Sequence, residues 1–366
     1  MALAGCAGAG AASAASSSTR IEVSVDRCGA GWTNPAAGAQ RFVLHNTDTR
    51  AGEVYLTDAR SGDVYAEVDP LAAGTTQTIA ITLGAGAYAF RCAMEDEQTV
   101  VGPTVTIASG PKTSPTAVPA VAQADLVEAT RAYQSYVSGQ LPTLASLTAM
   151  LQADIGRGDL AAARADWLPA HLEYERLGAA YGAFGDLDGE INGLPDGLQG
   201  GTADPAWAGF HRLEYGLWHG QDAATLSPVA AALAASVDNL AGTFAKAQID
   251  PLQLSLRAHE ITENALQFEL TGHTDYGSGS NLQTVAANLD GTATVLGILK
   301  PLLAERFPQL PQTLALLEKT RADIAAAPAL AALTRAQRER IDADVAQLAE
   351  DLAPVASMLE PRRANQ

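Results

Sequence analysis

The chain has 366 residues, of which 47% are apolar, so it is long enough for two domains with substantial cores. The sequence contains no run of about eighteen apolar residues, which argues against a membrane-spanning helix. Its formal net charge of −18 disfavours nucleic acids and anionic membrane surfaces as partners, and it favours cations.

The first twenty residues are predicted to be a lipidation signal and a tether. Leu3-Ala4-Gly5-Cys6 has the form of a bacterial lipobox, so Cys6 is the expected lipidation site. Small residues follow up to residue 20 and are too poor in apolar bulk to fold. Only five residues precede Cys6, so we expect the natural start to lie upstream; the alternative is a chance match in an Ala-rich chain. A lipid anchor implies an extracytoplasmic protein, on the outer face of the cytoplasmic membrane or periplasmic, where a disulfide between Cys28 and Cys92 is permitted.

Residues 21–108 have the pattern of a β-sandwich. Seven short stretches alternate apolar with polar residues and are separated by Gly, Pro, Asn and Asp turns: RIEVSV, QRFVLHN, GEVYLTD, DVYAEV, TQTIAITL, AYAFRC and PTVTIA. Seven strands in about ninety residues favour a Greek-key arrangement of two sheets. Residues 109–122 are rich in Pro, Ser and Thr and are predicted to be a linker.

Residues 123–366 have the pattern of a helical bundle. From this point the spacing of apolar residues changes from two to about 3.6, and the breaks between periodic segments carry Gly, Pro or Asp. The segments predict about eight helices, some of them paired by short loops.

Four segments of the predicted bundle contain residues that bind metals. They carry His171 with Glu175, His211 with Glu214, His259 with Glu263, and the loop from Gly272 to Gly277. In the first two segments the imidazole and the carboxylate are four or three residues apart, so both side chains lie on one helix face. Carboxylates and imidazoles from separate helices can build a transition-metal site inside a bundle. A surface or capping role is the alternative for any one of these side chains.

Three stretches of the bundle resemble imelysin-like proteins, and in particular EfeO-type iron-uptake components. GFHRLEYGLW resembles the HxxE motif, HLEYERLGAAYGAFGDLDGEIN resembles the YE...F.DLD..ID stretch, and GHTDYGSGSNLQTVAANLDGT resembles the HTD loop with the AN..G segment after it. The preceding β-rich segment resembles the cupredoxin-like module of this family. The resemblance implies a multidomain fold, in which an N-terminal all-β cupredoxin-like sandwich is followed by an all-α imelysin-like helical bundle.

The resemblance also implies a metal site between the helices of a bundle made of two four-helix halves. The residues that match its motifs are Glu175, His211, Glu214 and Asp275, with Glu269 and His171 as further candidates. One position departs from the family, because Asn192 stands where an aspartate is usual, and a neutral amide is a poorer ligand for a hard cation. The departure affects the affinity of the site or the identity of its metal, unless the neighbouring Asp188 or Glu190 substitutes.

A second metal site is implied in the β-domain. The family's cupredoxin-like module uses two cysteines and acidic residues for copper or ferric iron, and the matching residues here are Cys28, Glu53, Glu67, Cys92 and Met94. A blue-copper centre is not expected, because such a centre needs two imidazoles and His45 is the only histidine of this segment. A Cys28–Cys92 disulfide is the alternative to metal binding by the two sulfurs.

The resemblance implies a metal-binding lipoprotein of an EfeUOB-type system. Its cargo is expected to be Fe2+ or Fe3+, with zinc or copper as alternatives, and its expected partners are an EfeU-type iron permease and an EfeB-type haem peroxidase. A lipid anchor is the only expected membrane contact. Two alternatives remain open, a metallopeptidase and a ferroxidase or copper-binding protein that uses the β-domain. A zincin-type peptidase needs HExxH, whereas the string that begins at His259 ends in Glu263, so peptidase activity is not expected.

Overall fold

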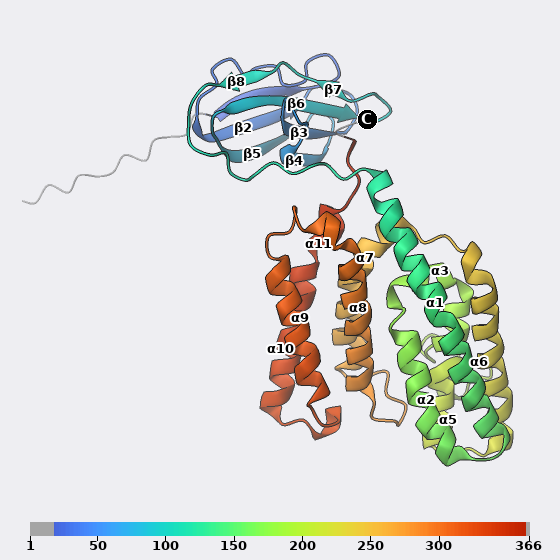
Figure 1. Ribbon diagram of the computed structural model, residues 1–366. Helices are drawn as coiled ribbons and strands as arrows, with labels where there is room; N and C mark the ends of the chain where they lie inside the picture. Colours follow the sequence, from blue (N-terminus) through green and yellow to red (C-terminus); the bar gives the residue numbers. More distant parts are fainter. Residues whose placement is uncertain (1–17, 364–366) are drawn as a thin grey trace, which may run out of the picture. The chain divides into compact units, whose positions relative to one another are not determined.

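The computed structural model describes residues 18–363, which divide into two compact units. The first unit extends to Ala122 and includes the chain again from Pro361, whereas the second is Gln123–Glu360. Strands build the first unit and helices the second (Figure 1). The expected fold class, a β-sandwich followed by a helical bundle, is therefore confirmed. The expected lipidation site, Cys6, and most of the tether lie outside the described residues.

The β-rich unit contains two sheets. Its strands are β1 (Ser18–Val23), β2 (Gly38–Asn46), β3 (Gly52–Asp58), β4 (Val64–Leu71), β5 (Thr76–Leu83), β6 (Gly86–Met94), β7 (Val100–Val101) and β8 (Val105–Ile107). One sheet has the order β1-β2-β5, and the other has the order β4-β3-β6-β7, with β8 also paired to β6. The buried positions of the alternating strands, such as Phe42, Leu56 and Phe90, share one core. The alternation of apolar and polar residues predicted the strands because one face of each sheet is buried.

Cys28 and Cys92 form a disulfide inside this core. The two cysteines are 64 residues apart in the sequence, and a cross-link over such a loop restricts the unfolded chain. Native disulfides of this kind typically contribute about 2–5 kcal/mol to stability. Because a disulfide sulfur is not a thiolate ligand, this bond replaces the alternative in which the two cysteines bind a metal.

The C-terminal segment returns to the β-rich unit through two arginines. Arg362 donates from Nε and Nη2 to both carboxylate oxygens of Glu67, at 2.9 and 2.7 Å. Arg363 donates from Nε to Glu53 Oε1 at 2.8 Å, and from Nη1 to the carbonyl of Met94 at 3.1 Å. The side chain of Met94 is buried in the core. The five residues of the second candidate metal site are therefore engaged otherwise, in a disulfide, in two arginine pairs and in core packing.

The helical unit contains two groups of four long helices. The first group is α1 (Gln123–Gly156), α2 (Leu160–Glu175), α5 (Gly209–Trp218) and α6 (Ala223–Thr243); the second is α7 (Pro251–Asn264), α8 (Asn281–Leu303), α9 (Leu310–Ala325) and α10 (Arg335–Leu352). In each group every helix packs against two others, so each forms a closed bundle. Contacts of α2 with α8 join the two groups. Three shorter helices lie in the connections and at the end of the unit: α3 (Tyr181–Phe184), α4 (Asp186–Asn192) and α11 (Pro354–Met358).

Side-chain caps set where several of the long helices begin. Asp159 and Asp222 accept the backbone N–H groups of the first turns of α2 and α6, and Asp250 does the same for α7. Thr334 and Gln337 form a reciprocal capping box at the start of α10. Each cap satisfies N–H groups that have no partner within the helix, which explains the polar breaks in the sequence pattern.

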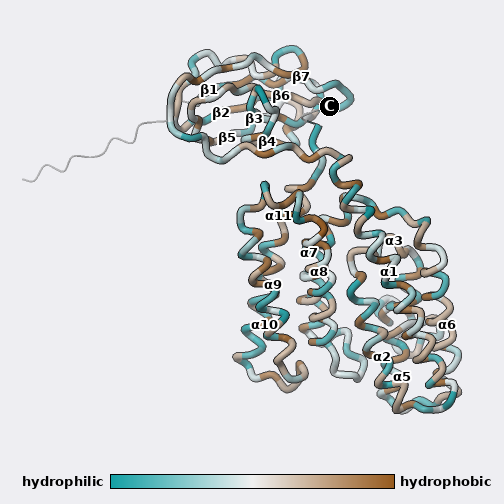
Figure 2. The backbone as a smooth tube through the Cα atoms, in the orientation of Figure 1, coloured by the Kyte–Doolittle hydropathy of each residue, from teal (hydrophilic) through white to brown (hydrophobic). Residues whose placement is uncertain are grey.

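Hydrophilic and hydrophobic residues are interspersed along the helices of the bundle (Figure 2). Within the described part of the chain, no helix combines the length and the apolar character needed to cross a membrane.

Candidate metal centre

A cavity of about 160 Å³ lies between the two helix groups. Residues of the first group meet residues of the second there, and Glu175 and Asn288, which meet at the cavity, are 113 positions apart in the sequence. The polar side chains around it come from several elements: Glu175 from α2, Asn192 from α4, His211 from α5, Arg257 from α7, and Asn288 from α8. Glu269 contributes from η4 (Ala265–Glu269), a π-helical continuation of α7. Such π-helical turns often occur at functional sites.

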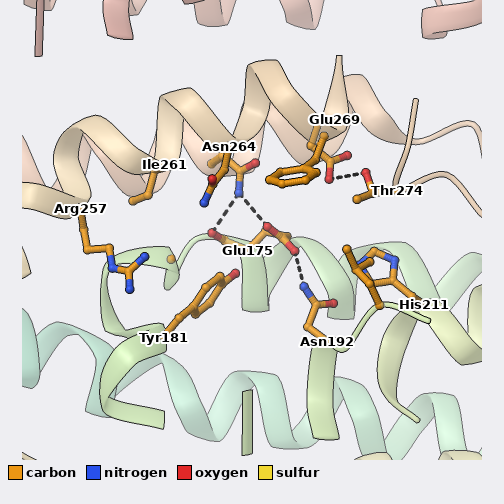
Figure 3. A pocket seen from close by; sticks show the side chains of 13 residues that line it. Glu175, Tyr181, Asn192, His211, Arg257, Ile261, Asn264, Glu269 and Thr274 are labelled. Atoms are coloured by element: carbon orange, nitrogen blue, oxygen red, sulfur yellow. Dashed lines mark hydrogen bonds between the residues drawn. The ribbon is translucent and has the colours of Figure 1, made fainter. Parts of the chain in front are cut away.

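Glu175 lies at the centre of the cavity lining and is buried (Figure 3). Its Oε1 accepts a hydrogen bond from Asn192 Nδ2 at 2.8 Å, and its Oε2 accepts one from Asn288 Nδ2 at 2.7 Å. His171 Nε2 lies 3.1 Å from Glu175 Oε1. Burial alone would raise the pKa of Glu175, but His171 and the Asn288 amide outweigh it and hold the pKa well below its usual value. The structure therefore keeps a buried carboxylate ionised.

Two imidazoles stand beside this carboxylate. The rings of His171 and His211 are 5.2 Å apart between centroids, and Trp167 stacks on His171 at 4.8 Å. Trp167 is itself held by a hydrogen bond from its Nε1 to the carbonyl of Phe210 at 2.9 Å. Trp167 therefore fixes the orientation of the His171 ring. It also ties α2 to α5 immediately before His211, because Phe210 precedes His211 in the sequence.

Glu214 connects α5 to the loop that follows η4. Its Oε1 accepts the N–H groups of Tyr276 and Ser278 at 3.1 and 3.0 Å and the hydroxyl of Ser278 at 2.5 Å. Its Oε2 lies 3.5 Å from His211 Nδ1. One oxygen of Glu214 thus anchors the loop, while the other faces the imidazole.

Glu269 is held by two neighbouring side chains. Thr274 donates its hydroxyl to Oε1 at 2.6 Å, and Asn281 donates Nδ2 to Oε2 at 2.9 Å. Burial raises the pKa of Glu269, and the negative charge of Glu175 raises it further. The carboxylates of this site are therefore close enough to disfavour each other's charge, which a cation between them would relieve.

The same negative charges also affect the pKa of His171. Burial alone would lower its pKa, but the hydrogen bond with Glu175 and the charges of Glu175, Glu214 and Glu269 raise it. The carboxylates around His171 thus stabilise a positive charge next to the cavity.

Two buried polar atoms at this site have no partner among the described residues, Nδ1 of His171 and Oδ1 of Asn192. Nε2 of His171 and Nδ1 of His211 each have only a carboxylate oxygen nearby, at 3.1 and 3.5 Å. A buried polar atom left unpaired costs about 1–3 kcal/mol, so unpaired atoms gathered at one site indicate a missing ligand. Imidazole nitrogens and carboxylate oxygens suit a transition-metal cation. Between residues 18 and 363, however, no three His, Cys, Asp or Glu side chains already stand in an arrangement that would hold a metal ion.

The structure gives Asp275 a different place from the other candidates. Its Oδ1 accepts the N–H groups of Gly277 and Gly279 at 2.8 and 3.1 Å, and it does not line the cavity. Asp275 therefore shapes the loop in this structure. His259 also lies elsewhere, with its Nδ1 2.9 Å from the carbonyl of Ala349 on α10.

Neither acidic neighbour of Asn192 substitutes for the missing carboxylate. Asp188 accepts the hydroxyl of Tyr174, and Glu190 accepts the hydroxyl of Ser236 on α6 at 2.7 Å. Asn192 itself points to Glu175 (Figure 3). The departure from the family pattern therefore leaves an amide at the site.

Several residues of the cavity lining were not among the predicted site residues, including Asn288, Tyr181 and Arg257. Asn288 belongs to the AN..G segment of the resemblance, so a signal was present although no role was assigned to it. Tyr181 lies within another stretch of the resemblance but matches none of its metal-ligand positions, and Arg257 lies in no motif. Only the packing of α7 against the first helix group places Arg257 at the cavity.

Known proteins resemble the chain along most of its length. The family model described as Imelysin matches residues 129–355, which is more than half of the chain. The iron uptake system component EfeO of Yersinia pestis is 28% identical over 334 residues, covering 88% of this chain and 86% of that protein. The protein of the same name from Escherichia coli strain K12 is 26% identical over 336 residues, with the same coverage.

Proposed function

The chain belongs to the imelysin family, and we propose that within this family it is the iron-binding component of an iron uptake system. One observation carries the proposal: Glu175, His211 and Glu269 line one cavity, and the buried His171 and Glu214 lie next to it, 3.1 Å from Glu175 and 3.5 Å from His211. A site that favours positive charge and offers oxygen and nitrogen donors suits iron. The relatives named as iron uptake components support iron as the cargo.

We propose further that the protein captures iron outside the cytoplasm and passes it to a membrane permease. Its acidic surface suits a carrier of cations, and the lipobox-like sequence around Cys6 would keep the carrier at the membrane. The resemblance adds an EfeU-type permease and an EfeB-type haem peroxidase as partners. The residues we assign to the cargo are His171, Glu175, His211, Glu214 and Glu269.

The two enzyme alternatives have less support. The sequence contains no HExxH string, and the nearest match, from His259 to Glu263, ends in Glu and directs His259 to the carbonyl of Ala349 on α10. A redox copper site in the β-rich unit would need thiolates, whereas Cys28 and Cys92 are joined. We therefore assign the bundle site to binding and not to catalysis.

Metal titration of three forms of the protein tests this proposal. Apo-protein is titrated with Fe2+ under argon in a calorimeter, and with Zn2+ in a parallel series. Wild type should bind one Fe2+ ion, and Glu175→Gln, which removes the central charge at constant shape, should bind about tenfold or more weakly.

The control is Glu173→Gln, two residues earlier on the same helix. Glu173 pairs with Arg176 at 3.2 Å, outside the cavity, so its removal should change the affinity less than about twofold. Wild type that binds no iron, or Glu175→Gln that binds as tightly as wild type, would show that the cavity is not the cargo site.

A further inference from the structure

We propose that the cargo enters this cavity as a complex of the metal ion with a small organic polycarboxylate. In this complex the ion lies at the end lined by Glu175, His211 and Glu269, and a carboxylate of the carrier molecule binds Arg257. The inference rests on the proposed function, because it concerns the form in which the same site receives its metal.

The cavity is larger than a single metal ion needs. Its volume of about 160 Å³ resembles that of cavities that hold a benzene-sized molecule. A single metal ion would fill only a small part of this space. A second component is therefore needed, either an organic molecule or several water molecules.

The two ends of the cavity differ in charge. One wall is a single face of α7 and its continuation η4, because Arg257, Ile261, Asn264 and Phe268 follow one another at helical spacing. The part from Arg257 to Asn264 extends for about 10 Å along the helix axis. In Figure 3, Arg257 lies to one side of Glu175 and His211 to the other. The cavity thus has a guanidinium at one end and metal-binding groups at the other.

The guanidinium of Arg257 is only partly satisfied by the protein. Arg257 Nη1 pairs with Glu260 Oε2 at 2.9 Å, but its Nε is buried and has no hydrogen-bond partner. A guanidinium binds a carboxylate best through two parallel N–H donors. A carboxylate that reaches Arg257 from the cavity would satisfy the unpaired Nε.

Charge explains why the two components must arrive together. A free carboxylate would meet the negative charges of Glu175 and Glu269, and a bare cation would leave the buried Nε of Arg257 without a hydrogen-bond partner. A metal–polycarboxylate complex brings a cation to the acidic end and an anion to the basic end. Phe268, which is 37% exposed, adds an apolar surface to the lining of the cavity.

Equilibrium dialysis with 14C-labelled citrate, a tricarboxylate, tests the inference. Wild type should retain the label when Fe3+ is present and lose it when Fe3+ is left out. Arg257→Gln, which keeps two N–H donors and removes the charge, should retain the ferric complex about tenfold more weakly. The same variant should bind Fe2+ without citrate within about twofold of wild type, because it retains every metal ligand.

Arg335→Gln is the matched control, since Arg335 is an exposed arginine paired with Glu339 on α10. It should behave as wild type in both experiments. If wild type binds iron and retains no label, or if Arg257→Gln retains the label as well as wild type, the inference is wrong and the proposed function stands. If wild type binds neither Fe2+ nor the ferric complex, the proposed function itself fails. The wild-type result alone decides the inference if Arg257→Gln does not fold.

Discussion

Asn192 shows how a single residue can balance metal binding against the stability of the metal-free site. Its Nδ2 donates to Glu175 at 2.8 Å, while its Oδ1 is buried without a partner. A carboxylate at this position would add a ligand for a cation, but it would also place a second negative charge next to Glu175. We infer that the amide stabilises the metal-free protein at the expense of affinity.

The substitution Asn192→Asp tests this balance. The added charge should destabilise the metal-free protein by about 1–2 kcal/mol and lower its melting temperature by several degrees. The affinity for Fe2+ should rise about tenfold, because the cation gains a carboxylate ligand. Calorimetric titration and thermal unfolding measure both effects. Asn239→Asp, on an exposed position of α6, provides the control and should change neither quantity appreciably. If Asn192→Asp also changes neither, the amide does not act on Glu175.

At the scale of elements, the start of α5 places two candidate ligands. Gly209 begins this helix with a φ of +85°, which few residues other than glycine adopt, and His211 and Glu214 follow within the first two turns. A Cβ atom at Gly209 would lie 2.3 Å from the carbonyl oxygen of Ile191, next to Asn192. The close approach of α5 to the end of α4 therefore depends on this glycine.

Gly209→Ala should destabilise the helical unit by about 2 kcal/mol or more, because it adds both backbone strain and a clash. It should also weaken iron binding, since α5 must shift relative to α4. Gly242→Ala is the control: Gly242 lies within α6, and a Cβ there would meet nothing within 4 Å. That substitution should stabilise the protein by about 0.5–1 kcal/mol. Thermal unfolding of the two variants should therefore show shifts of opposite sign.

At the scale of the whole molecule, the two compact units hold different stabilising features. The disulfide lies in the β-rich unit, and the cavity lies in the helical unit. We expect differential scanning calorimetry to show two transitions that respond to different treatments. A reducing agent should lower the transition temperature of the β-rich unit, because that unit loses the roughly 2–5 kcal/mol of stability that the disulfide contributes. Iron should raise the transition temperature of the helical unit, because it binds the folded state.

The double variant Cys28→Ser, Cys92→Ser is the control for reduction. Without any reducing agent, the β-rich unit of this variant should unfold at the same temperature as the β-rich unit of the reduced wild type. A single transition that moves with both treatments would contradict the independence of the two units.

Local patterns in the sequence were sufficient to predict the strands and the helices. Apolar spacing changes from two to about 3.6 near residue 123, and this spacing follows directly from which faces of a strand or a helix are buried. Glu175 and His211 lie on the predicted helices and meet at one cavity, next to His171. The prediction of the helices succeeded because burial of a helix face depends on residues that are close together in the sequence, whereas the metal site stays a prediction.

Contacts between distant segments were decided only by tertiary packing. Asn288 reaches Glu175 across 113 residues, and Arg363 reaches Glu53 across 310. No periodicity relates such pairs, because each depends on how whole elements pack and not on the local pattern of either. For the same reason, the carboxylates and imidazoles could be identified from the sequence, whereas only the three-dimensional structure shows that Arg257 lies at the end of the cavity opposite to His211 (Figure 3).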